Sequence, residues 1–307
     1  MIRKKGLLAI SGADGFIGGA FKRRALESGY DIRILSRVPD DSTSGFETRF
    51  FDLLDPSSLG PELLDGCNAV AHFASYIPKD QGDLSEAQSC WQANALGTMY
   101  LLRAAEAAGV KNFIQSGAGN AYSPQLEAAT ESHQMMPTRA PYYLSSKIVQ
   151  EVFANSWAKS SKMRIVTLKP SSVYGPGQRQ GPFTRMALAL LEGKKISVQH
   201  GGSFVADFVH VDDVVEAAFQ VWDKDWKGAI NVGSGTRTTI LQAVRLLVEE
   251  TGADWERDVD LEPAPEKPDV GFPGLDVTSL RSLGIHPRPV AVGIADLVNS
   301  LRGETQR

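Results

Sequence analysis

The chain has 307 residues, of which 42% are hydrophobic and 22% are charged, and its formal net charge is −4. This size suits one large domain or two closely joined domains, and the slight negative charge gives no reason to expect a nucleic-acid or acidic membrane partner. The two cysteines, Cys67 and Cys90, imply no disulfide framework, and the five histidines have no metal-like spacing with them. No run approaches the ~18 apolar residues of a membrane span. We therefore expect a cytoplasmic protein without a metal ion.

The first 37 residues predict a strand, a glycine-rich turn, a helix and a second strand. An apolar run at 6–11 is followed by Gly12, Gly15 and Gly18, spaced three apart, and then by a helix-compatible stretch at 16–28. Glycine suits a tight turn whose backbone must approach a ligand closely. The helix N-terminus then presents N–H groups to an anion, most simply a pyrophosphate. The alternative is a glycine-rich turn without a ligand.

Short apolar runs recur along the first 170 residues, as in buried parallel strands. We expect strands at residues 6–11, 32–35, 48–53, 69–74, 111–116 and 164–169. Helices are expected at 16–28, 59–64, 84–108 and 143–159. This alternation predicts an α/β fold with a doubly wound parallel sheet, and ligands beyond the carboxyl ends of its strands. Asp52, Ala74, Ser116 and Pro170 each lie just after a strand.

From residue 171 the pattern changes. Glycine–proline breaks are followed by expected helices at 183–192, 212–222 and 240–251, a strand at 207–211 and a proline-punctuated tail. We expect a first domain over 1–170, with returning segments near 205–235, and a smaller domain over 171–307.

Tyr143 and Lys147 carry the candidate chemistry. They are four residues apart, on one face of the predicted helix at 143–159. An unperturbed tyrosine has a pKa of ~10 and is a poor base at neutral pH. A nearby cation favours the phenolate and lowers that pKa, and the same lysine can hydrogen-bond a nucleotide ribose.

An ordered set of motifs now covers nearly the whole chain. The set consists of Gly12-x-x-Gly15-x-x-Gly18, Asp52-Leu53, His72-Phe-Ala-Ser75, Asn94 with Gly97-Thr98, Tyr143-x-x-x-Lys147, Lys169-Pro-Ser-Ser-Val-Tyr-Gly-Pro176, Asp207-Phe-Val-His-Val-Asp-Asp213 and Asn231-Val-Gly-Ser-Gly235. In this set the chain resembles the extended short-chain dehydrogenase/reductase family, which holds nucleotide-sugar epimerases, dehydratases and ketoreductases.

The resemblance implies a Rossmann-type domain that binds NAD or NADP, a smaller C-terminal α/β substrate domain, and a substrate lodged between them. By position, Tyr143 would exchange a proton with the substrate hydroxyl or carbonyl, with Lys147 and Ser116 as its catalytic partners. Asn94 would support the cofactor, or would simply pack its helix. The implied cofactor contacts are Gly12, Asp14, Gly15, Phe16, Ile17, Gly18, Ser36, Arg37, Asp52, Leu53, Phe73, Ala74, Ser75, Asn94, Tyr143, Lys147, Pro170 and Val173.

The end of the second strand bears on the choice of cofactor. NAD-preferring members place a carboxylate there, whereas this chain has Ser36-Arg37 and no acid until Asp40. A guanidinium and a hydroxyl suit the 2′-phosphate of NADP, which we favour over NAD. The alternative is an arginine that stacks on the adenine of NAD.

One departure from the family pattern concerns the hydroxyl that hydrogen-bonds the reacting oxygen. Relatives usually carry Ser or Thr four residues before the tyrosine that stands here as Tyr122, and this chain has Ala118. An alanine cannot donate a hydrogen bond. Ser116 and Asn120 remain as substitutes. The alternative function is a dinucleotide-binding sensor or scaffold that turns over slowly or not at all.

A second departure concerns the substrate. Nucleotide-sugar members often carry arginine where Ala206 stands and asparagine where Ser172 stands. Arg179 and Arg185 are candidates to hold a diphosphate instead, so a nucleotide sugar remains favoured over a non-sugar ketone or aldehyde. The other candidate substrate residues are Tyr76, Asn120, Ser172 and His210.

The family also implies an oligomer. In relatives, the helices that correspond to 84–108 and 143–159 pair across a two-fold axis, so we expect a homodimer. Extra apolar residues on these helices, including Met99, Leu102, Val152 and Phe153, fit that expectation, although burial against the sheet explains them equally.

Overall fold

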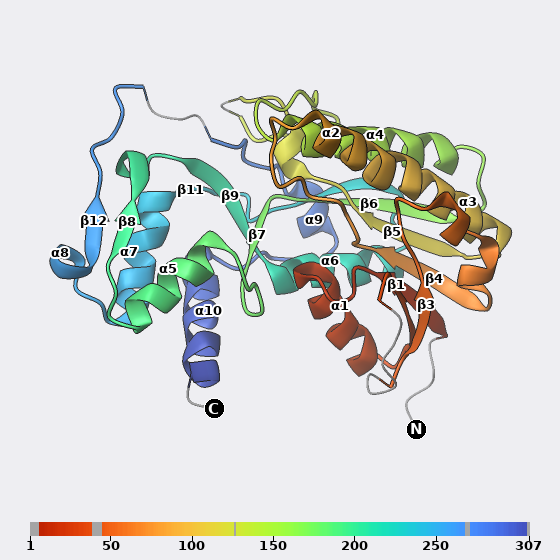
Figure 1. The fold of residues 1–307 in the computed structure, drawn as a ribbon, viewed down its shortest axis with the longest axis horizontal. Helices are drawn as coiled ribbons and strands as arrows, with labels where there is room; N and C mark the ends of the chain where they lie inside the picture. The colour runs from red at the N-terminus through yellow and green to blue at the C-terminus, as the bar shows by residue number, and fades with distance from the viewer. Residues whose placement is uncertain (1–5, 39–44, 126, 268–270, 306–307) are drawn as a thin grey trace. The chain divides into compact units, whose positions relative to one another are not determined.

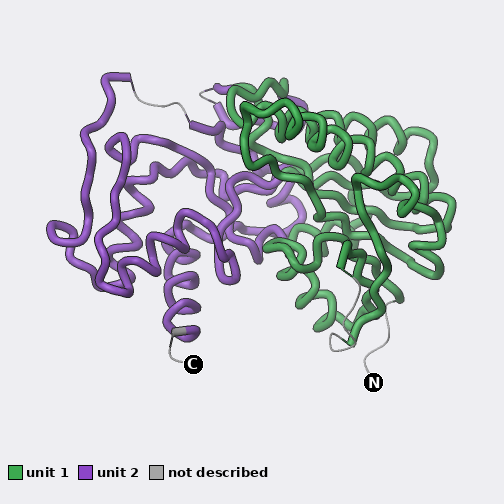
Figure 2. The backbone as a smooth tube through the Cα atoms, in the orientation of Figure 1, with its two compact units in different colours: residues 1–123, 134–169, 215–230 green, residues 124–133, 170–214, 231–307 purple. Residues whose placement is uncertain are grey.

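The computed structural model describes residues 6–38, 45–125, 127–267 and 271–305. The chain forms two compact units, drawn in green and purple in Figure 2. Unit 1 comprises residues 1–123, 134–169 and 215–230, and unit 2 comprises residues 124–133, 170–214 and 231–307. Each unit therefore contains segments that are distant in sequence.

Unit 1 is built on a seven-stranded sheet with the strand order β10-β6-β5-β4-β1-β2-β3. The strands are β1 (Leu7–Ser11), β2 (Asp31–Ser36), β3 (Glu47–Phe50), β4 (Cys67–His72), β5 (Asn112–Ser116), β6 (Arg164–Pro170) and β10 (Gly228–Val232). All neighbouring pairs from β3 to β6 are parallel. The order reverses between β1 and β4, which is the switch point where such sheets bind ligands.

Helices cover both faces of this sheet, as Figure 1 shows. One face carries α1 (Phe16–Glu27) and α6 (Val211–Asp223), and the other carries α2 (Leu84–Cys90), α3 (Thr98–Ala107) and α4 (Pro141–Ala158). Phe21 of α1 stacks on Phe219 of α6, with ring centroids 5.0 Å apart. This arrangement confirms the predicted doubly wound α/β fold.

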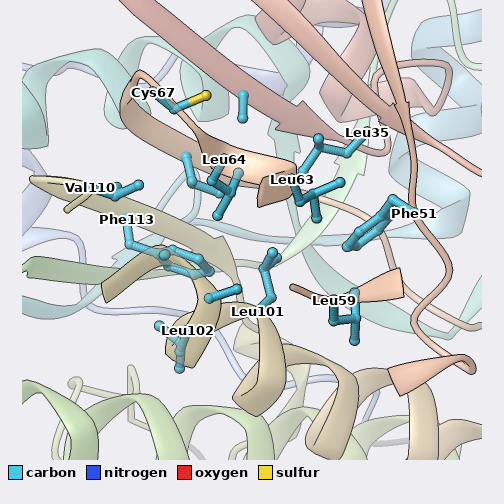
Figure 3. Packing of buried hydrophobic residues seen from close by; sticks show 14 of the residues in the cluster. Leu35, Phe51, Leu59, Leu63, Leu64, Cys67, Leu101, Leu102, Val110 and Phe113 are labelled. Carbon is cyan, nitrogen blue, oxygen red and sulfur yellow. The ribbon is translucent and has the colours of Figure 1, made fainter. Parts of the chain in front are cut away.

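One hydrophobic cluster of unit 1 lies between the sheet and α3, as shown in Figure 3. Leu101 and Leu102 of α3 are fully buried against Phe113 of β5. Full burial of such a side chain contributes about 1.5–3 kcal/mol. Leu102, a sequence candidate for a dimer face, is therefore a core residue, whereas Val152 of α4 is 53% exposed.

Unit 2 contains a three-stranded sheet of order β11-β9-β7 and a two-stranded sheet of β12 and β8. Its strands are β7 (Ser172–Tyr174), β8 (Ile196–Val198), β9 (Val205–His210), β11 (Arg237–Thr239) and β12 (Val259–Leu261). Its helices are α5 (Pro182–Leu191), α7 (Ile240–Thr251), α8 (Trp255–Asp258), α9 (Thr278–Ser282) and α10 (Val290–Thr305).

The single helix expected over 84–108 is interrupted. Residues Trp91–Gly97 form a π-helical segment between α2 and α3. A Cβ on Gly97 would lie 2.7 Å from the carbonyl oxygen of Leu53, so the helix passes that backbone closely here. π-Helical segments often occur at functional sites, and this one carries Asn94.

Two further expectations need correction. The helix expected at 59–64 is instead a pair of short 3₁₀ turns, Pro56–Ser58 and Pro61–Leu64, each begun by a proline. The proline-punctuated tail, in which no helix was expected, contains α10, a 16-residue helix. Its buried residues recur at helical spacing, but the prolines just before Val290 obscured that pattern. The buried set is Val290, Ile294, Leu297, Val298 and Leu301.

Candidate active site

The glycine turn joins β1 to α1 at the switch point. Gly12 has φ +72°, and a Cβ there would lie 2.6 Å from the backbone nitrogen of Ala74, which follows β4. A Cβ on Gly18 would overlap the carbonyl oxygen of Gly12. Gly12 and Gly18 are therefore required by the packing of the turn. The structure brings the turn against Ala74, as expected for neighbouring parts of one site.

Gly15 has a different environment. It is the N-cap residue of α1, with φ −77°, and the nearest atom to a Cβ there would be the Gly12 carbonyl oxygen at 3.1 Å. No side chain caps the helix, and its first turn contains no acidic residue. The first turn of α1, with Phe16 and Ile17, therefore offers backbone N–H groups to an anion that approaches closely. This geometry fits a dinucleotide pyrophosphate.

Tyr143 and Lys147 lie on the first turns of α4, and Ser75 lies three residues beyond the end of β4. Lys147 Nζ donates a hydrogen bond to Ser75 Oγ at 3.1 Å, and the Tyr143 phenol is also hydrogen-bonded to Ser75. Lys147 is 2% exposed. Two predicted catalytic residues and a predicted cofactor residue therefore form one cluster.

Burial dominates the electrostatics of this cluster. It raises the pKa of Tyr143 to about 12, while the hydrogen bond with Ser75 acts in the opposite direction. Burial also lowers the pKa of Lys147 to about 7. The Tyr143 pKa is therefore raised by desolvation rather than lowered by Lys147 as expected, and the lysine is hydrogen-bonded to Ser75.

Asn94 lies in the π-helical segment and is 1% exposed. Its Oδ1 accepts from the backbone nitrogen of Tyr76 at 2.7 Å, and its Nδ2 donates to the Tyr76 carbonyl and to Ser146 Oγ, both at 2.9 Å. Ser146 immediately precedes Lys147, and the sequence analysis did not single it out. Asn94 therefore joins the segment that carries Ser75 to the helix that carries Lys147.

His72 lies at the end of β4 beneath the glycine turn. Its Nδ1 is 2.6 Å from Ser11 Oγ and its Nε2 is 2.9 Å from Thr98 Oγ1. Burial, reinforced by the charge of Lys147, lowers the pKa of His72 to about 3. His72 is therefore a packed, hydrogen-bonded residue, and it is neutral near pH 7.

The hydroxyl candidates after β5 are less well placed. Ser116 Oγ donates to the carbonyl oxygen of Gly117 at 3.3 Å. Ala118 is buried at the start of the 3₁₀ turn Gly119–Ala121, which also contains Asn120. Among the described residues, the hydrogen bond of the Ser116 side chain is to the neighbouring Gly117 carbonyl and not to Tyr143 or Lys147.

The candidate adenosine contacts lie at the ends of β2 and β3. Ser36 Oγ accepts from the backbone nitrogen of Val38 at 3.2 Å, and Arg37 is exposed. Asp52 accepts from the backbone nitrogen of Leu54 at 3.0 Å. Asp40, which figured in the cofactor argument, lies outside the described residues.

Unit 2 contains a cavity of about 880 Å³ between α5, β8 and the start of α7. It is mainly apolar, and Arg185, His200 and Lys267 bring cationic or titratable groups to its wall. Arg185 was predicted from the sequence, whereas Arg179 does not line the cavity. Lys267 was missed because no local pattern marks a lysine in a proline-rich loop.

The remaining candidate residues of unit 2 lie outside the described cavity. His210 Nδ1 lies 2.8 Å from Arg288 and accepts from the backbone nitrogen of Asp212 at 3.2 Å. Its pKa is lowered, chiefly by burial and then by the charge of Arg288. Pro170 ends β6, while Ser172 and Val173 belong to β7. None of these residues lines the described cavity.

Two further findings concern the described residues. Within the described ranges, no group of three or more His, Cys, Asp or Glu side chains is arranged to hold a metal ion. None of the helices in these ranges combines the length and apolar character needed to cross a bilayer.

The parallel sheet, the glycine turn at its switch point and the Tyr143–Lys147 pair define a dinucleotide-binding α/β oxidoreductase fold. A sequence profile described as the NAD dependent epimerase/dehydratase family matches residues 8–233. The chain belongs to this family and is an NAD(P)-dependent enzyme.

Individual relatives have several activities. UDP-glucose 4-epimerase of Mycolicibacterium smegmatis is 27% identical, covering 97% of this chain and 99% of that protein. GDP-6-deoxy-D-mannose reductase of Pseudomonas aeruginosa is 31% identical, covering 67% of this chain and 70% of that protein. The solved structure of MoeE5 in complex with UDP-glucuronic acid and NAD has a TM-score of 0.83 and 25% identity, covering 97% of this chain and all of that one.

Proposed function

We propose that the protein catalyses reversible oxidation at a secondary alcohol of a nucleotide-activated sugar, as an epimerase, a dehydratase or a ketoreductase. The observation that carries this proposal is the cluster of Tyr143, Lys147 and Ser75 beside a glycine turn suited to a dinucleotide. The names of the relatives support a nucleotide-sugar substrate.

Each part of the site in unit 1 has a distinct task in this proposal. When bound, the nicotinamide ring takes up or gives back a hydride. Tyr143 accepts or donates a proton at its phenolic oxygen, and Lys147 provides the cation that favours the phenolate and a donor for the ribose. Gly12 and Gly18 allow the turn to pack, and Gly15 leaves room for the pyrophosphate to approach the N-terminus of α1.

The cavity of unit 2 is proposed to hold the nucleotide part of the substrate. Its apolar wall suits a base, and Arg185 and Lys267 provide positive charge for a diphosphate. Arg185 therefore takes precedence over Arg179 as a substrate residue.

Turnover of UDP-glucose, dTDP-glucose and GDP-linked 4-ketosugars, with Tyr143→Phe as the matched inactive control, tests the proposed reaction. The nucleotide content of the purified protein then separates the subclasses. A dinucleotide that is retained through purification indicates an epimerase or dehydratase, and one that exchanges freely indicates a reductase. Turnover unchanged in Tyr143→Phe would refute the proposed role of the phenol.

The choice between NADP and NAD rests on Ser36 and Arg37. A guanidinium at the end of β2 favours the 2′-phosphate of NADP, whereas the MoeE5 complex contains NAD. Dissociation constants for NADPH and NADH, measured with the wild type and Arg37→Ala, decide the question. Under the NADP proposal the variant loses affinity for NADPH alone, and tighter binding of NADH by the wild type reverses the proposal.

A second candidate function is a dinucleotide-binding sensor or scaffold. It is favoured by Ala118, which leaves no hydroxyl at the position where relatives carry one. Tight binding of a dinucleotide without turnover of any nucleotide sugar or simple ketone would support this candidate over the enzyme.

We also propose a homodimer. Leu84 of α2, Trp91 of the π-helical segment and Val152 of α4 are 78%, 44% and 53% exposed, which is unusual for large apolar residues on adjacent helices. Sedimentation velocity of the wild type and of a Val152→Asp variant tests it. A dimer that the variant dissociates supports the proposal, and a monomeric wild type refutes it.

A further inference from the structure

Ser75 occupies a position between the two functional groups of α4. Its Oγ is 3.1 Å from Lys147 Nζ and is also hydrogen-bonded to the phenol of Tyr143. Ser75 lies on the segment after β4, whereas Tyr143 and Lys147 are one helical turn apart on α4. One hydroxyl from a different element therefore connects both side chains.

The surroundings hold this hydroxyl in place. The backbone nitrogen and carbonyl of the next residue, Tyr76, are both bound by the side chain of Asn94. Asn94 in turn donates to Ser146, which immediately precedes Lys147. The segment that carries Ser75 is thus fixed to the helix that carries its two partners, so its position does not depend on a flexible loop.

The chemistry of the three groups sets the direction of the hydrogen bonds. A protonated lysine has donors only, so Ser75 Oγ accepts from Lys147. When Tyr143 is a phenolate it has no donor, so the hydroxyl of Ser75 must donate to it. Ser75 then passes the polarising effect of the ammonium group to the phenolate through two charge-assisted hydrogen bonds.

Two residues at or just after the end of β5 are poorly suited to this task. Ala118 has a methyl group, and the Ser116 hydroxyl is directed to its neighbouring carbonyl oxygen at 3.3 Å. We propose that Ser75 is the positioning residue whose hydroxyl links the phenolic oxygen of Tyr143 to the ammonium group of Lys147. The kinetic consequences of this inference rest on the proposed function, whereas its effect on the titration of Lys147 does not.

The kinetic test compares Ser75→Ala and Ser75→Thr with the matched control Ser160→Ala, an exposed serine of the same unit. Loss of one such donor lowers kcat by about 10²-fold. We expect that loss in Ser75→Ala, with KM changed less than about threefold and with the pH limb assigned to Tyr143 moved to higher pH. Ser75→Thr retains most of kcat. Ser75→Ala with a wild-type kcat and pH profile overturns the proposal.

A second measurement does not require turnover. The ε-carbon ¹³C shift of Lys147, assigned by its disappearance in Lys147→Met, reports the titration of the amine in the apoprotein. Removal of the acceptor destabilises the ammonium form, so Lys147 titrates at lower pH in Ser75→Ala than in wild type. An unchanged titration overturns the proposal. If wild type shows no turnover but the titration moves, the proposed function fails while the link through Ser75 stands.

If Ser75→Ala does not fold, Ser75→Cys replaces it in both measurements, because a thiol fills the space but is a weak donor and acceptor.

Discussion

Asn94 donates a hydrogen bond to the Ser146 hydroxyl at 2.9 Å, and this bond joins the π-helical segment to α4. The same amide binds both backbone groups of Tyr76. All three hydrogen bonds of this buried side chain are made within the protein. We infer that Asn94 holds the segment that carries Ser75 in place beside Lys147.

We expect Asn94→Ala to reduce both stability and turnover. The substitution removes two hydrogen bonds to the partly buried backbone groups of Tyr76 and one to Ser146, and each group left unsatisfied costs about 1–3 kcal/mol. Urea unfolding should therefore show a loss of at least about 2 kcal/mol, while Asn155→Ala, an exposed asparagine of α4, should change stability by less than about 0.5 kcal/mol. Equal stability of the two variants would contradict this role for Asn94.

Substitutions in the glycine turn can distinguish an effect on folding stability from an effect on dinucleotide binding. A Cβ on Gly18 would overlap the Gly12 carbonyl, so Gly18→Ala should destabilise the protein by about 1–3 kcal/mol. Gly15 has an allowed φ of −77°, and its nearest neighbour would be 3.1 Å away. Gly15→Ala should therefore fold nearly normally but bind the dinucleotide at least about tenfold more weakly, a loss of about 1.4 kcal/mol. Thermal unfolding and titration with NAD and NADP measure the two effects. Unimpaired dinucleotide binding by Gly15→Ala would show that the pyrophosphate does not bind at this turn.

Lys147 is expected to destabilise the folded apoprotein, so Lys147→Met should raise its stability while turnover is lost. Burial lowers the lysine pKa to about 7, whereas in the unfolded chain it is ~10.4. Between these values the unfolded chain binds a proton that the folded chain does not. The contribution of Lys147 to the free energy of unfolding therefore rises with pH across this window.

The advantage of the methionine variant should accordingly be largest at about pH 7 and smaller at about pH 9. Urea unfolding of the wild-type and variant apoproteins at these two pH values measures the difference. A variant that is less stable than wild type at the lower pH would show that Lys147 is compensated by contacts other than Ser75.

The sequence was sufficient for the parts of unit 1 whose signals are local. The glycine triplet, the apolar strands and the four-residue spacing of Tyr143 and Lys147 are all local patterns, and they predicted the sheet and the Tyr143–Lys147 pair. The electrostatics could not be predicted in the same way. The spacing of Tyr143 and Lys147 suggested a lowered phenol pKa, but the actual shift depends on how deeply the two groups are buried.

The features that were missed depend on contacts between distant segments. The π-helical segment passes close to the Leu53 carbonyl through Gly97, and Ser75 meets Lys147 across 72 positions of sequence. Lys267 reaches the cavity of unit 2 from a loop with no periodic pattern. No local composition or spacing encodes these distances, so the three-dimensional structure was needed to find them.

Arg185 and Arg179 provide a matched pair for testing the cavity of unit 2. Both are exposed arginines, but only Arg185 lines the cavity. If Arg185 binds the substrate diphosphate, Arg185→Ala removes a charged hydrogen bond worth about 1.5–3 kcal/mol and should raise KM for the nucleotide sugar at least about tenfold. Because the diphosphate does not react, kcat should change little. Arg179→Ala should leave both constants unchanged, and Arg185→Lys should recover part of the affinity because it restores the charge without the planar fork. Steady-state kinetics of the three variants would exclude this cavity as the diphosphate site if Arg179→Ala impaired KM as much as Arg185→Ala.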